Sequence, residues 1–198
     1  MKPIYVIGID VGLANMGVVK AELLPQGFAI VDAFVISTEK SDKKREVKVA
    51  DDNIRRVMEL VDKLYPVFDD DVIAICAEAL SLPRNASAAS KISLAFGAMA
   101  TIATINNIPI LQSSPQEVKK ATVGTKSASK TEMIAAIKQR FPKMKWPKKT
   151  TLHEHQADAT ASIVSCLNHP VLVSAKKIMK DCDVSPPELK IVPFPAKS

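Results

Sequence analysis

The first forty residues alternate apolar runs with polar turns in a way that predicts three successive strands. Runs rich in Ile and Val occupy residues 4–10, 16–22 and 28–37, and Gly, Asn and Pro lie between them. Strands joined by such short turns pair antiparallel. The chain is therefore expected to open as a three-stranded meander.

Strands and helices alternate after this meander. Beyond a charged connector at 39–52, Asn53 is a plausible N-cap for a helix whose apolar residues recur at helical spacing as far as Leu64. Two more strands are expected at 72–78 and 108–112, and further helices at 85–106, from Ser114, at 130–140 and at 153–167. This order predicts an α/β protein with a ribonuclease-H-like fold, in which a mixed five-stranded sheet carries helices on both faces.

Length and composition favour one globular domain. A chain of 198 residues with 47% hydrophobic content is long enough for a single core, which we place at 1–169. Residues 170–198 form a Pro-rich extension in which we expect only a short helix, near 174–179.

The cysteines and the N-terminus indicate a cytoplasmic protein. Cys76, Cys166 and Cys182 show no C-x-x-C spacing, so we expect all three to be reduced. The N-terminus lacks the features of a signal peptide. The low-charge stretch at 92–112 is interrupted by Pro109, which favours a buried helix followed by a strand over a membrane span.

Three carboxylates occur where apolar segments end or begin. Asp10 closes the first strand, Glu78 closes the strand at 72–78, and Asp158 lies early in the last helix. An ionised carboxylate in an apolar strand costs several kcal/mol unless a cation or hydrogen-bond donors meet it. We therefore expect a divalent metal ion where these segments converge.

Four motifs follow one another along the chain. They are GIDVG at 8–12, Glu78 with NASAASK at 85–91, PQEVKKATVG at 115–124 followed by ASK at 128–130, and HQADATA at 155–161. In this order they resemble the RuvC-type Holliday junction resolvases of the ribonuclease-H-like superfamily. The resemblance runs from residue 4 to about residue 168.

The resemblance implies a catalytic site that binds two Mg²⁺ ions, with Mn²⁺ as a substitute. Asp10, Glu78, His155 and Asp158 would be the metal ligands, and Lys119 would assist at the scissile phosphate. Hard oxygen ligands suit these ions. Family members carry Asp or His at the position of His155.

Alternative roles remain open for some of these residues. Glu154 could replace or share the ligand role of His155, and Glu78 could instead form an ion pair with Arg84. A zinc pair of His153 and His155 lacks further Cys or His partners.

The net charge of +6 favours a polyanionic partner. By resemblance, the DNA-binding residues are Arg84, Lys91, Lys119 and Lys130. The segment KMKWPKK at 143–149 has two interpretations: a loop that contacts DNA, or a solvated connector with Trp146 packed on the core.

The resemblance implies a homodimeric, metal-dependent endonuclease that cleaves four-way (Holliday) and other branched DNA in recombination and repair. The setting would be a bacterial cell or a phage-infected host, and the compact size fits a phage member. Ser81 stands where bacterial members have an aromatic residue, and Leu82 is an apolar substitute for part of its role. The alternatives are a ribonuclease-H-like nuclease acting on flaps or structured RNA, and an inactive scaffold that binds branched nucleic acid.

Overall fold

The fold is organised around one mixed β-sheet. The structure, a computed structural model, describes residues 2–42, 48–69, 71–81 and 83–183. The strands are β1 (Tyr5–Asp10), β2 (Asn15–Leu24), β3 (Gly27–Ser37), β4 (Val72–Glu78) and β5 (Ile110–Ser113), in the spatial order β3-β2-β1-β4-β5. The first three strands are antiparallel, and β4 and β5 run parallel to β1. The predicted five-stranded mixed sheet is confirmed.

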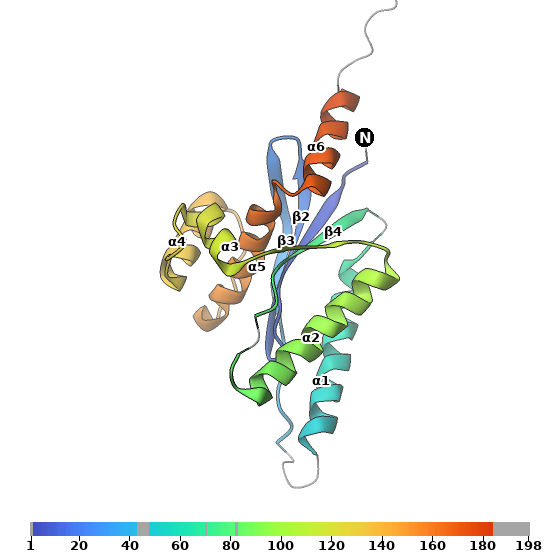
Figure 1. Ribbon diagram of the computed structural model, residues 1–198, viewed down its shortest axis with the longest axis vertical. Coiled ribbons are helices and arrows are strands. Elements are labelled where there is room, and N and C mark those ends of the chain that lie inside the picture. The colour runs from blue at the N-terminus through green and yellow to red at the C-terminus, as the bar shows by residue number, and fades with distance from the viewer. Residues whose placement is uncertain (1, 43–47, 70, 82, 184–198) are drawn as a thin grey trace, which may run out of the picture.

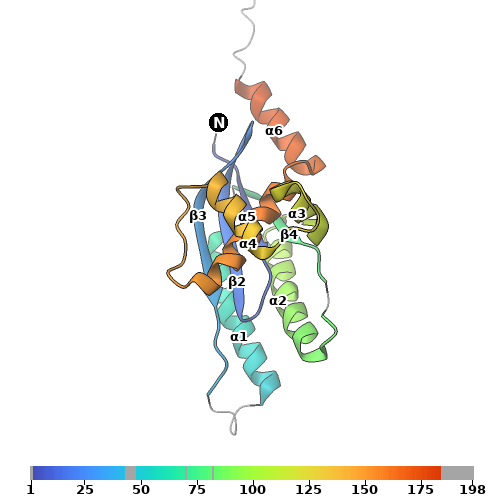
Figure 2. The same cartoon turned by 90° about the vertical axis from the view of Figure 1, so that its left-hand side faces the viewer.

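Helices cover both faces of this sheet (Figure 1). They are α1 (Val49–Leu64), α2 (Ala86–Ile105), α3 (Pro115–Val123), α4 (Lys130–Arg140), α5 (His153–Cys166) and α6 (Pro170–Asp183). Ile7 and Ile9 of β1 point to the face packed by α1 and α2, and Val6 points to the face packed by α5. Figure 2 shows α3, α4 and α5 together on that second face.

Two glycines let α5 lie directly on the sheet. A Cβ atom at Gly8 would come within 2.2 Å of the carbonyl oxygen of Ala159, and one at Gly17 within 2.0 Å of the carbonyl oxygen of His155. No side chain other than hydrogen fits such an approach between a strand and a helix. The glycines therefore set the position of the first turns of α5 over β1 and β2.

Two capping boxes fix the starts of α3 and α4. Ser114 accepts a hydrogen bond from the backbone of Glu117, whose side chain accepts one from the backbone of Ser114. Ser129 and Glu132 repeat the arrangement at α4. Each box satisfies two backbone donors that the first helical turn leaves unpaired. Both predicted helix starts are confirmed.

The start of α1 differs from the prediction. The helix begins at Val49 after Lys48, four residues before the expected cap at Asn53. Asp51 and Asp52 lie in its first turn, where negative charge is favourable, and Asp52 pairs with Arg55 at 2.8 Å. These acidic residues thus belong to the helix and not to the connector. Residues 43–47 of the connector lie outside the described residues.

The C-terminal helix is longer than expected. α6 runs from Pro170 to Asp183, because Leu172 is buried and Ala175 and Met179 pack on the same apolar cluster. The expected helix near 174–179 is only its middle. Residues 184–198, with most of the prolines of the predicted extension, lie outside the described residues.

The low-charge stretch forms a helix and then a strand, as predicted. α2 is long and apolar enough to cross a membrane by length and composition, which is weak evidence for such a role. Met99 and Ile102 pack into the core, yet only 22% of its apolar window is buried. One face of α2 is therefore uncovered, contrary to the expectation of a buried helix. Cys76 and Cys166 are free and buried, and the side chain of Cys182 lies outside the described part.

Candidate active site

Asp10 and Glu78 lie at the same edge of the sheet. Each is the last residue of its strand, and β1 and β4 are parallel neighbours in which Ile9 pairs with Ala77. The carboxyl ends of both strands therefore meet at one place. The negative charge of Asp10 reaches Glu78 strongly enough to affect its pKa.

Helix α5 brings His155 to this edge. The Nδ1 atom of His155 lies 2.7 Å from Oδ2 of Asp10, in a hydrogen bond between partly buried side chains. This bond, with the charge of Asp10, raises the pKa of His155. Asp158 follows three residues later, on the same face of the helix. The first turns of α5 thus add two potential ligands to the strand carboxylates.

Burial and neighbouring negative charge raise the pKa values of two carboxyl groups in the site. Burial, followed by the charges of Asp10 and Glu78, raises the pKa of Asp158 to about 7. Loss of hydration and the charge of Asp10 raise the pKa of Glu78, and Lys119 acts in the opposite direction. The raised pKa values of Asp158 and Glu78 therefore reflect burial first and the repulsion of neighbouring carboxylates second.

A divalent cation fits this donor set. The oxygen donors of Asp10, Glu78 and Asp158 are hard ligands of the kind that Mg²⁺ and Mn²⁺ prefer, and a cation would relieve their repulsion. Among the described residues, no three Asp, Glu, His or Cys side chains are yet gathered closely enough to hold one ion. The side chain of Asp10 is instead turned to His155.

The four predicted DNA-binding cations occupy different positions around the site. Lys119, on α3, acts electrostatically on Glu78. Lys130, at the start of α4, forms an ion pair with Glu154 at 2.7 Å. Lys91, on α2, shares a groove with His155 and the turn Gly12–Asn15. Arg84 is exposed before the start of α2.

The structure discriminates among the alternatives for the nearby residues. Oε2 of Glu154 pairs with Lys130 and its Oε1 lies 3.8 Å from Nε2 of His155, whereas His155 itself contacts Asp10, so the geometry favours His155 as the neighbour of the strand carboxylates. The ring of His153 contacts the carbonyl oxygen of Pro147 at 2.9 Å and therefore does not share a site with His155. Among the described residues, no ion pair joins Glu78 to Arg84.

Sequence comparison assigns the chain to a known family. The family model described as crossover junction endodeoxyribonuclease RuvC matches residues 6–166. The chain belongs to the RuvC family. The RuvC protein of Treponema denticola is 28% identical over 165 residues, which cover 82% of this chain and 85% of the relative. The RuvC protein of Pseudothermotoga lettingae is 30% identical over 135 residues, 67% of this chain and 77% of the relative.

Solved RuvC structures have the same fold. The Thermus thermophilus RuvC structure superimposes with a TM-score of 0.64 at 22% identity, and covers 82% of this chain and 92% of its own. T. thermophilus RuvC in complex with Holliday junction substrate gives a TM-score of 0.65 with the same coverage. The match to the family model ends at Cys166, the last residue of α5, so α6 lies beyond it.

Two features of the site were not predicted from the sequence. The first is the hydrogen bond between Asp10 and His155, which joins residues 145 positions apart. The second is Gly17, whose lack of a side chain allows the backbone of His155 to approach β2. A glycine within an apolar strand is a usable signal for such an approach.

The raised pKa values predict how the stability of the metal-free protein depends on pH. Asp158, with a pKa of about 7 when folded, titrates near pH 4 when unfolded, so the folded state binds more protons between these values. Glu78 and His155 are shifted upward as well. Stability should therefore fall as pH rises from about 4 to 7. Asp158→Asn should raise the free energy of unfolding at pH 8 by roughly 1–3 kcal/mol, and by less at pH 5.

This prediction is checked by thermal melting in EDTA at several pH values. The exposed Asp62→Asn variant on α1 is the control and should follow the parent. If Asp158→Asn gives the same melting curve as the parent at pH 8, Asp158 is not crowded by the other carboxylates.

Proposed function

We propose that the protein is a metal-dependent endonuclease that cleaves four-way (Holliday) and other branched DNA as a homodimer. The supporting observation is the convergence of Asp10, Glu78, His155 and Asp158 at one sheet edge, in a chain of the RuvC family. T. thermophilus RuvC in complex with Holliday junction substrate, a protein of the same fold, supports branched DNA as the substrate class.

Asp10, Glu78, His155 and Asp158 are the proposed ligands of the metal ions. Two divalent ions, when bound, supply an activated water and offset charge on the leaving oxygen. Asp10, on the central strand β1, would be a ligand to both ions. Ligation requires a neutral imidazole at His155 and an ionised Asp158, and the pKa values of both groups are raised in the metal-free protein, so metal binding should be favoured by rising pH.

Cations around the site are the proposed phosphate contacts. Lys119 acts electrostatically on Glu78 and is suited to hold the scissile phosphate. Lys130 can exchange its ion pair with Glu154 for a phosphate, since its side chain is 75% exposed. Lys91 and Arg84 would hold the backbone on the side of α2 without reading sequence.

The homodimer is proposed to form through the outer face of α1 and α2. Ile54 and Met58 of α1 are more than half exposed, and so is Ile105 of α2. A groove lined by Ile54 and Leu94 runs between the two helices. Apolar side chains at this density suit a two-fold interface, which would give each dimer two active sites for two strands.

His155 should control how activity depends on pH. A protonated imidazole cannot bind metal, so cleavage should decline as pH falls through about 6.5. The bond to Asp10 raises the pKa of His155 in the metal-free protein, so the decline should move to lower pH as Mg²⁺ increases. His155→Asp should remain active, with the acid-side decline at lower pH. Single-turnover cleavage rates from pH 5 to 9 measure this effect.

A histidine outside the site provides the control. His169→Gln, just beyond the far end of α5, should keep the parent pH profile. An unchanged profile in His155→Asp would assign the acid-side decline to another group, such as Asp158, and not to His155.

Ser81 predicts broad substrate use. The residue is exposed, just beyond the end of β4, and offers no ring to stack on an opened base. Because one such stacking contact is worth roughly 1–3 kcal/mol, its lack should weaken any preference that depends on an unpaired junction centre. We expect cleavage of three-way and flap DNA within about tenfold of the four-way junction, with little preference for sequence. Leu82, the apolar substitute suggested for part of the role of the aromatic residue, lies outside the described residues.

The proposed function is tested on linear, flap, three-way and four-way DNA of matched sequence with Mg²⁺, and again with Ser81→Phe. Cleavage of branched substrates supports the proposal, and the aromatic variant should sharpen the preference for the four-way junction. Equal cleavage of linear DNA would indicate a general nuclease, and cleavage of RNA in preference to DNA would indicate a ribonuclease. If the parent cuts a single short sequence and leaves flaps intact, Ser81 has no effect on selectivity.

A further inference from the structure

The net positive charge of the chain is concentrated in one short segment. Residues 138–149, here called the basic segment, comprise the end of α4 and the loop that follows. It contains six cations and no acidic residue: Lys138, Arg140, Lys143, Lys145, Lys148 and Lys149. The other 21 Lys and Arg residues of the chain equal its 21 Asp and Glu residues, so this segment accounts for the whole net charge of +6.

The backbone of the basic segment is held by helix α5. The Nε2 atom of Gln156 donates a hydrogen bond to the carbonyl oxygen of Lys145 at 2.7 Å. The Nε2 atom of His153 lies 2.9 Å from the carbonyl oxygen of Pro147. Met144 is buried in the apolar cluster beneath α5. Both anchoring residues flank His155, so the segment is fixed beside the residue proposed to bind metal.

The ring of Trp146 is occupied by protein contacts. It packs against the edge of His153 with ring centroids 5.1 Å apart, and the Nζ atom of Lys138 lies 5.0 Å from its centre. The ring is partly buried against the same cluster. The connector interpretation therefore holds for Trp146, and the segment presents cations without a free aromatic ring for stacking on bases.

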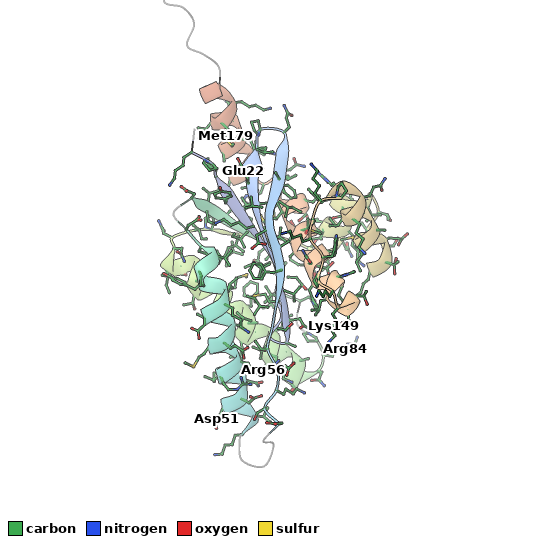
Figure 3. All side chains as sticks on the ribbon, turned by 180° about the vertical axis from the view of Figure 1, so that it is seen from behind. Glu22, Asp51, Arg56, Arg84, Lys149 and Met179 are labelled. Carbon is green, nitrogen blue, oxygen red and sulfur yellow. The ribbon has the colours of Figure 1, made fainter. Side chains whose placement is uncertain are left out.

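A groove runs between the basic segment and the edge strand β3. It has a volume of about 380 Å³, and its charged lining residues are Arg140, Lys143 and Lys145 on one side and Asp32 on the other. Figure 2 shows the loop beside β3. In Figure 3, Lys149 lies in the lower half of the molecule, and Met179 of α6 lies at the opposite end.

We propose that the basic segment is a second nucleic-acid contact, which binds the phosphate backbone of a duplex arm that leaves the active site. Exposed cations on a fixed backbone suit phosphates, and the occupied ring of Trp146 excludes recognition by base stacking. The contact is therefore independent of sequence. That the partner is DNA rests on the proposed function. The charge and the geometry of the basic segment are independent of it.

The test compares two pairs of lysine substitutions on the full chain. Lys143→Gln with Lys148→Gln removes two charges from the basic segment, and Lys177→Gln with Lys180→Gln removes two from α6 at the other end. Binding of duplex and four-way DNA is measured by fluorescence anisotropy in EDTA between 50 and 200 mM salt. Log affinity falls with log salt, and each lost phosphate contact makes this slope shallower by about 0.9. The first pair should therefore make the slope shallower by about 1.8 and weaken binding roughly tenfold at 100 mM. The α6 pair should leave the slope unchanged.

Removing a negative charge from the same groove completes the test. Asp32→Asn removes the negative charge from the groove and should strengthen binding a few-fold at low salt. Should the first pair lower the melting temperature, Lys145→Gln with Lys149→Gln gives the same comparison, since these substitutions leave the backbone contacts in place.

The outcomes separate this inference from the proposed function. Equal effects of the two lysine pairs, or no effect of either, would overturn the inference even if branched DNA is cleaved. A reduced slope specific to the basic segment would support it even if the protein cleaves none of the branched substrates, in which case the proposed function fails. The rate of cleavage at saturating DNA should not change in the basic-segment variants.

Discussion

Asp10→Asn is expected to abolish cleavage while junction binding stays close to that of the parent. Asp10 contacts His155 and acts electrostatically on Glu78, and if it is the proposed metal ligand, losing metal stabilisation of several kcal/mol lowers the rate by about a thousandfold or more. Binding should be retained because the change removes a negative charge that repels phosphate. Cleavage is measured on a four-way junction with Mg²⁺, and binding by anisotropy in EDTA.

Asp62→Asn, on the exposed side of α1, is the matched control and should cut at the parent rate. Loss of both cleavage and binding in Asp10→Asn would indicate misfolding, which its melting curve reveals. An Asp10→Asn protein that retains a tenth of the parent rate would show that the site does not depend on this carboxylate.

Gly17→Ala is expected to lower the free energy of unfolding by about 3 kcal/mol, near the upper end for overpacking. The new Cβ atom would lie 2.0 Å from the carbonyl oxygen and 2.5 Å from the carbonyl carbon of His155, and backbone atoms cannot give way as a flexible side chain can. Helix α5 must therefore move away from β2. Because the same helix holds His155 against Asp10, cleavage should fall together with stability. Denaturant unfolding and junction cleavage measure the two effects.

The chain offers a control glycine. Nothing lies within 4 Å of a Cβ atom placed at Gly97, in the middle of α2, so Gly97→Ala should stabilise the protein by about 1 kcal/mol through helix propensity. If Gly17→Ala is as stable as the parent, the close approach of α5 to the sheet does not hold the fold together.

The strands and most helix starts could be predicted because local chemistry determines them. The β-branched runs have no stable alternative to a sheet, and Ser114 and Ser129 each have a Glu three residues later to complete a capping box. The carboxylates could be predicted because an apolar strand that ends in an ionised residue calls for a nearby cation. Their assignment to one site needed the order of the four motifs.

Other features depend on contacts between distant segments. The start of α1 was misplaced because Asp52 is stabilised by Arg55 and the helix as a whole by the core, neither of which a capping rule includes. The length of α6 depends on the burial of Leu172 beneath the sheet. The orientation of Trp146 depends on Lys138 and His153. The sequence alone cannot distinguish the two interpretations of that loop, because the decisive contacts join distant segments.

The central claim is tested most directly by the products formed from a synthetic four-way junction. The junction and linear duplexes with the sequences of its arms are incubated with the protein in Mg²⁺ or in EDTA, and each strand is labelled in turn. We predict paired cuts in two opposing strands, which yield nicked duplexes, only in Mg²⁺ and not in the linear controls. A junction that is bound but left uncut in Mg²⁺, or linear duplexes cut as fast as the junction, would contradict the account.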